Sequence, residues 1–173
     1  LSPFEDATVV SIDGFGDFSS AVWGRGRHGA IHIEGRVFFP HSLGLFYQAL
    51  TQHLGFPHYG DEYKVMGLAP YGEPRFMDQM RRIVALKEGG GFELDLRFFR
   101  HASEGIVYEW TGGSPVIGTL FTPALEELLG PARAPDAPLE QRHKDLARSI
   151  QAMFEEAVLH LSNTLPRRHA VDA

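Results

Sequence analysis

The sequence predicts an α/β fold in which an antiparallel β meander comes first and helices dominate the rest. Two observations support this division. Residues 7–12 and 18–23 are rich in β-branched and apolar side chains and flank an Asp-Gly turn. From Ser42 onward, apolar residues recur at spacings of three and four, the period of an amphipathic helix. A chain of 173 residues is long enough to bury a core of its own.

The meander is expected to continue to residue 39. Glycines between residues 24 and 29 are predicted to break the second strand, because glycine is disfavoured inside strands. Residues 30–39 alternate between apolar and polar side chains, which predicts one or two further strands with a turn at Gly35.

Capping and helix-ending residues locate the later elements. Asp61 is expected to cap a short helix with its carboxylate, and Val65, Met66 and Leu68 are expected to face inward. Pro166 is predicted to close the last helix. Predicted helices cover residues 42–55, 61–68, 74–86, 122–130 and 146–165, and predicted strands cover 92–98 and 106–110.

Composition excludes several classes of protein. With 16 basic and 22 acidic residues the net charge is −6, which argues against a nucleic-acid partner. No apolar run approaches the roughly 20 residues of a membrane span, and a chain without cysteine has no disulfides or thiol nucleophile. We therefore expect a cytoplasmic protein with no membrane contact. Aromatic residues expected in the core are Phe38, Phe39, Phe46, Tyr47, Phe98 and Phe99.

The turn Asp13-Gly14-Phe15-Gly16-Asp17 is a candidate phosphate site. Glycines let backbone N–H groups approach a phosphate, and a carboxylate at a strand end can hold hydrated Mg²⁺. An ordinary hairpin is the alternative, since Asp-Gly is a common turn dipeptide.

A second candidate segment covers residues 60–72. A short helix there could present Lys64 to an anionic ligand. The alternative is a capped surface helix in which Lys64 pairs with Glu62.

The chain has nine histidines, which could in principle bind a metal ion, but their spacing does not favour a metal site. His28 and His32 lie four apart, but within a strand that spacing does not bring imidazoles together. We predict no intrinsic metal site built only from these residues. Catalytic triads, a Walker loop and a Rossmann fingerprint have no support either.

Taken in order, the two candidate segments resemble the large carbamoyltransferases of the NodU/CmcH type. Residues 2–7 followed by 12–17 are similar to that family's Ser-Pro-Phe and Asp-Gly-x-Gly-Glu passage, with Asp17 in place of the usual Glu. The more specific match is residues 42–56 followed by Glu62-Tyr63-Lys64-Val65-Met66-Gly67-Leu68-Ala69-Pro70-Tyr71-Gly72.

The resemblance implies an actin-like nucleotide-binding domain, of which residues 1–173 would be an internal, partial domain. A YrdC-like domain would lie outside this chain. It also implies that carbamoyl phosphate and ATP form carbamoyladenylate, whose carbamoyl group passes to a hydroxyl of a small-molecule acceptor, a sugar or an antibiotic. The isolated fragment is expected to be inactive.

Carried over by position, the resemblance assigns Asp13, Gly14, Gly16 and Asp17 to the nucleotide phosphates and Mg²⁺, and Lys64 to catalysis. Iron or another divalent metal is expected in the full-length protein, with ligands mostly outside these residues. A homodimer is a further expectation. The alternatives are a non-catalytic binding or dimerisation module and a sugar-kinase-like enzyme of the same fold.

Overall fold

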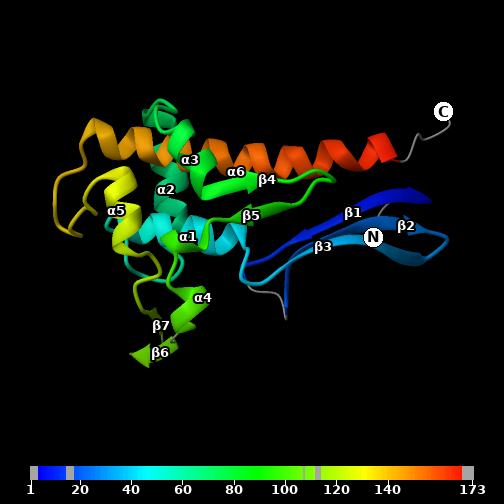
Figure 1. Cartoon of the computed structure of the whole chain (residues 1–173), viewed down its shortest axis with the longest axis horizontal. Coiled ribbons are helices and arrows are strands. Elements are labelled where there is room, and N and C mark those ends of the chain that lie inside the picture. The colour runs from blue at the N-terminus through cyan, green and yellow to red at the C-terminus, as the bar shows by residue number, and fades with distance from the viewer. Residues whose placement is uncertain (1–3, 15–17, 107, 112–113, 169–173) are drawn as a thin grey trace.

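A computed structural model describes residues 4–14, 18–106, 108–111 and 114–168. Its first strands form one antiparallel sheet in the order β1-β2-β3. Figure 1 shows this sheet extending away from a body of helices. The predicted meander is thereby confirmed. Its strands are β1 (Asp6–Ile12), β2 (Ser19–Arg27) and β3 (Ala30–Phe38).

Three glycines predicted to break or turn the strands instead lie within them. β2 runs through Gly24 and Gly26, and β3 runs through Gly35. A Cβ on Gly35 would lie 2.2 Å from Cζ2 of Trp23, and one on Gly24 would lie 2.1 Å from the backbone oxygen of His32. The prediction was wrong because Gly35 makes room for the indole ring of Trp23 and Gly24 makes room for the neighbouring strand.

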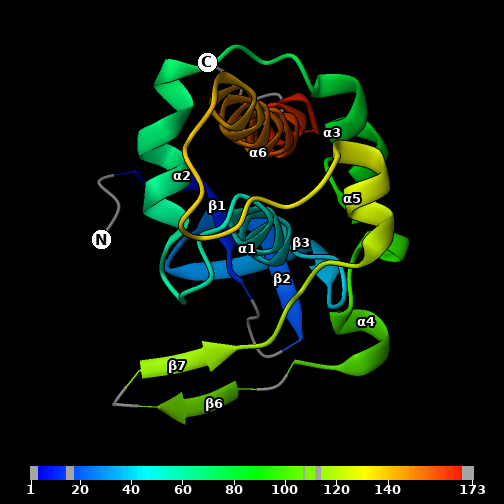
Figure 2. The same cartoon turned by 90° about the vertical axis from the view of Figure 1, so that its left-hand side faces the viewer.

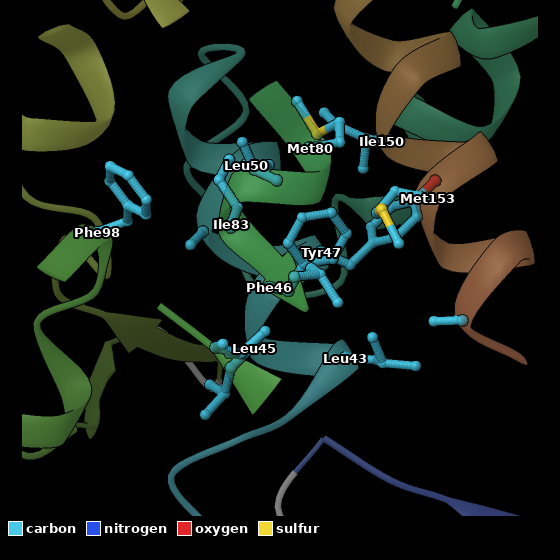
Figure 3. Packing of buried hydrophobic residues seen from close by; sticks show 14 of the residues in the cluster. Leu43, Leu45, Phe46, Tyr47, Leu50, Met80, Ile83, Phe98, Ile150 and Met153 are labelled. Atoms are coloured by element: carbon cyan, nitrogen blue, oxygen red, sulfur yellow. The ribbon is translucent and has the colours of Figure 1, made fainter. Parts of the chain in front are cut away.

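Helices α1 (Leu43–His53) and α6 (Gln141–Arg168) form the centre of the helical body. Figure 2 looks along both, with α2 (Glu62–Leu68) on one side and α3 (Met77–Ile83) on the other. Figure 3 shows the core between α1, α3 and α6. Its fully or almost fully buried side chains include Phe46, Leu50, Met80, Ile83, Ile150 and Met153.

The predicted third helix is shorter than expected. It ends at Ile83, because the next three residues form β4 (Val84–Leu86) and pair with β5 (Phe92–Leu94). Asp95 then accepts the Arg97 N–H and begins a 3₁₀ turn, which ends the strand expected over 92–98. The remaining elements are η1 (Ala69–Tyr71), η2 (Leu96–Phe98), α4 (His101–Glu104), β6 (Tyr108–Thr111), β7 (Ser114–Ile117) and α5 (Pro123–Leu129).

Helix α6 was predicted to close at Pro166, and it continues to Arg168. The expectation of an end at Pro166 was therefore wrong by two residues. Helix α5 begins and ends close to the predicted residues 122–130.

Some inward-facing predictions also fail. Phe46, Tyr47, Phe98, Phe99 and Val65 are buried as expected. Met66 is 52% exposed, and Phe38 and Phe39 are 56% and 39% exposed. The seven-residue helix α2 buries only one residue, Val65, so Met66 stays exposed. Phe38 and Phe39 are exposed because they line an open hollow at the end of β3.

Candidate functional site

A pocket of about 440 Å³ lies where β1 ends, between α1, α2 and α6. The strand end contributes Asp13 and Gly14. Its other lining residues are Gly44, Tyr47, Gln48, Tyr59, Gly60, Glu62, Met66, Gln151 and Phe154. The pocket therefore gathers residues that are far apart in the sequence around the predicted phosphate turn.

The phosphate turn is held against the first turn of α1. The Asp13 N–H donates to the Ser20 oxygen at 2.8 Å, and the Ser42 hydroxyl donates to the Gly14 oxygen at 2.6 Å. A Cβ on Gly44 would lie 2.5 Å from Cα of Gly14, so only glycine permits this approach. A Cβ on Gly14 would meet nothing within 4 Å, which shows that the turn borders open space.

Sequence reasoning placed four residues in this turn, and the structure brings two of them to the pocket. Asp13 and Gly14 line it. Gly16 and Asp17 lie outside the described residues.

One wall of the pocket is an ordered network of aromatic and amide side chains. The Tyr47 hydroxyl donates to Oε1 of Gln151 at 2.8 Å, and Nε2 of Gln151 donates to Glu155 at 2.9 Å. Phe154 packs edge-on against Tyr47 with ring centroids 5.8 Å apart. Burial raises the pKa of Tyr47, and nearby Glu62 and Glu155 raise it further, so the phenol stays a neutral hydrogen-bond donor.

Two polar side chains face the pocket without a partner among the described residues. Gln48 is only 7% exposed, and its amide makes no hydrogen bond there. Glu62 is half-buried and forms no ion pair or hydrogen bond in the described part of the chain. Neither side chain is among those with a fully buried polar atom lacking a partner in the described residues, so their polar atoms are open to the pocket. Polar groups of this kind that converge on a pocket can orient a ligand.

Lys64 does not line the pocket, although Glu62 and Met66 of the same helix do. Its Nζ lies 2.7 Å from Oδ1 of Asp61 and 5.6 Å from the ring centroid of Phe56. The expected pair with Glu62 is therefore wrong. Asp61 makes no capping bond to α2, because its carboxylate instead accepts the His58 N–H and pairs with Lys64. The hydrogen bond from Asp61 raises the pKa of Lys64.

Among the described residues, no group of three or more histidine or acidic side chains is arranged to hold a metal ion. Within the same residues, no helix is both long and apolar enough to cross a membrane.

Gln48, Tyr47, Gln151 and Phe154 were not predicted as site residues. Gln48 carried a signal that could have revealed it: it is a polar residue between apolar ones on a buried helix. Gln151 and Phe154 carried none, because their place in the pocket depends on how α6 packs against α1.

Other hollows are less suited to a ligand. One of about 500 Å³ between α3 and α5 is lined by Asp78, Arg82, Arg97 and Glu127, with the guanidinium of Arg97 already paired with Asp95. Asp78, Arg82 and Glu127 of that hollow are exposed, whereas the pocket at the end of β1 is distinguished by Gln48, which is only 7% exposed, and by its aromatic wall.

Fold and pocket together define an α/β domain with a pocket lined by polar and aromatic side chains at the end of β1. The chain belongs to the carbamoyltransferase N-terminus family, whose family model matches residues 1–172. This agrees with the resemblance drawn from the sequence.

Relatives with known sequences support the assignment. An uncharacterized protein of Synechocystis sp. is 40% identical over 168 residues, which are 95% of this chain and 25% of the relative. Nodulation protein NolNO of Sinorhizobium fredii is 32% identical, with 93% of this chain and 20% of the relative covered. Nodulation protein NolO of Bradyrhizobium diazoefficiens is 33% identical, covering 92% and 25%. The chain thus spans at most a quarter of these relatives.

Proposed function

We propose that this chain forms the nucleotide-binding part of an O-carbamoyltransferase. The enzyme would hydrolyse carbamoyl phosphate to carbamate and phosphate, and carbamate would then attack the α-phosphate of ATP to form carbamoyladenylate and release pyrophosphate. The enzyme would then pass the carbamoyl group to a hydroxyl of a sugar or antibiotic, releasing AMP. One observation carries the proposal: in a member of the carbamoyltransferase family, the glycine turn at the end of β1 opens into a pocket with unpaired polar groups.

The residues of the pocket fit a magnesium nucleotide. Open space at Gly14 leaves room for a phosphate beside the backbone, and the Asp13 carboxylate is an oxygen ligand of the kind Mg²⁺ prefers. Bound Mg²⁺ would neutralise phosphate charge. This matters because the described lining residues include no Lys or Arg.

The domain to which this chain contributes is, in this proposal, an actin-like nucleotide-binding domain. The three-stranded antiparallel sheet followed by helices is consistent with part of an actin-like domain. A YrdC-like domain and the ligands for iron or another divalent metal would be supplied by residues outside this chain. The isolated chain would then bind nucleotide weakly and would not turn over.

Calorimetric titration of MgATP into the intact protein and its Asp13→Asn variant tests the proposal. We expect binding to weaken at least tenfold in the variant, because a metal-coordinating charge is lost. Absence of MgATP binding to the intact protein would contradict the proposal and favour the non-catalytic module.

Product analysis separates the two enzyme candidates. Carbamoyl transfer through an adenylate releases AMP, whereas a sugar kinase of the same fold would release ADP. Sedimentation of the intact protein tests the predicted homodimer separately.

A further inference from the structure

Gln48 and Glu62 come from different helices and line the same pocket. Gln48 lies in α1 and Glu62 begins α2. In the described part of the chain neither side chain has a hydrogen-bond or ion-pair partner, so an amide and a carboxylate are both available to a ligand. A ligand group that both donates and accepts hydrogen bonds would satisfy the two together.

The distance of Gln48 from the glycine turn, and the charge of Glu62, restrict which part of a ligand can lie between them. Gly44 touches Gly14, and Gln48 follows four residues later on α1, about 6 Å farther along the helix axis. That distance is about the size of one sugar ring. The Glu62 carboxylate disfavours a phosphate at this point, because like charges repel at short range.

Building on the function proposed above, we propose that Gln48 and Glu62 both bind the ribose 2′-hydroxyl of the nucleotide and select ribonucleotides over 2′-deoxyribonucleotides. The amide N–H donates to a ribose oxygen, and the carboxylate accepts a hydroxyl proton. Carboxylates read ribose hydroxyls in the same way in other nucleotide-binding folds. Tyr47, Gln151 and Phe154 then form the wall beside the sugar and base.

The test compares the binding of MgATP and Mg-2′-deoxyATP to the intact protein by calorimetry. The wild type is expected to bind MgATP about tenfold more tightly, the effect of losing one hydrogen bond to a charged group. Gln48→Met and Glu62→Met should each reduce this ratio toward one, while their affinity for Mg-2′-deoxyATP stays within about twofold of the wild type. Glu127→Met removes a carboxylate from the distant helix α5 and is expected to keep the tenfold ratio.

The possible results of this titration distinguish the ribose assignment from the proposed function. Equal binding of both nucleotides by the wild type would overturn the ribose assignment and leave the proposed function standing. Equal weakening of both nucleotides in the variants would show a structural role and would also overturn the assignment. Failure of either nucleotide to bind the wild type would contradict the proposed function itself.

Discussion

The Ser42 hydroxyl holds the Gly14 carbonyl at 2.6 Å and also accepts the N–H of Leu45 at 3.2 Å. One side chain therefore caps α1 and fastens the end of β1 to it. The phosphate turn and the helix that carries Gln48 are consequently positioned by the same hydroxyl.

Replacing Ser42 with alanine removes both bonds. We expect the free energy of unfolding to fall by about 1–3 kcal/mol, since a helix cap and a long-range hydrogen bond are lost together. Urea denaturation measures the change. Ser42→Thr keeps the hydroxyl and should lose much less; an equal loss in both variants would contradict the explanation.

Gly44→Ala is expected to disrupt the pocket. The new methyl group would lie 2.5 Å from Cα of Gly14, so the backbone must shift and nucleotide affinity should fall at least tenfold. Gly67→Ala is the matched control, because a Cβ there meets nothing within 4 Å. It should raise stability by up to about 1 kcal/mol, because alanine is the better helix former. Loss of binding in both variants would contradict the steric explanation.

Gln48→Met is expected to raise stability in the absence of ligand. Gln48 is 7% exposed and its amide has no hydrogen-bond partner among the described residues, so an apolar side chain of similar length should raise the free energy of unfolding by up to about 1 kcal/mol. Thermal denaturation without nucleotide is the measurement. A loss of stability would indicate that the amide has a structural partner.

Stability should decrease as the pH falls below about 7. Burial lowers the pKa values of His53 and His101 in the folded state, so the unfolded chain binds more protons near its own pKa of about 6.5. Among the described residues, the buried Nδ1 of His101 has no hydrogen-bond partner, so a proton added there would have no acceptor. We expect the free energy of unfolding to be lower at about pH 5.5 than at about pH 7.5. These two pH values lie roughly one unit below and above the histidine pKa of the unfolded chain.

The control for this pH effect is substitution of the histidines themselves. His53→Gln and His101→Gln should each be less stable overall and show a smaller difference between the two pH values. An unchanged difference would assign the effect to other groups.

Lys64→Met tests the catalytic role predicted from the sequence. Since Lys64 pairs with Asp61 and does not line the pocket, MgATP affinity should change by less than about threefold, whereas carbamoyl transfer should fall at least tenfold. Lys87→Met, a lysine paired with Glu93 in the β4–β5 hairpin, is the control and should leave both unchanged. Unchanged transfer in Lys64→Met would end the catalytic assignment.

Sequence reasoning recovered the features that depend on local signals. The meander, α1 and α5 follow from alternation, helical spacing and capping residues near each other in the chain. β4 was missed because its pairing with β5 overrides a helical pattern.

The site residues, too, were predictable only where a local sequence motif marked them. Asp13 and Gly14 were predicted from a compact motif, and both line the pocket. Phe154 and Gln151 could not be predicted, since only packing between α1 and α6 brings them there. Lys64 was predicted from its segment and from the family resemblance, and the sequence did not reveal that Lys64 would pair with Asp61 outside the pocket.

The contact between Gly14 and Gly44 is made by main-chain atoms, and it requires glycine at residue 44. The side chains of Gln48 and Glu62 line the same pocket and make no hydrogen bond to either glycine among the described residues. We therefore expect substitutions of Gln48 and Glu62 to change the lining of the pocket while the glycine contact and the Ser42 hydrogen bond keep their positions.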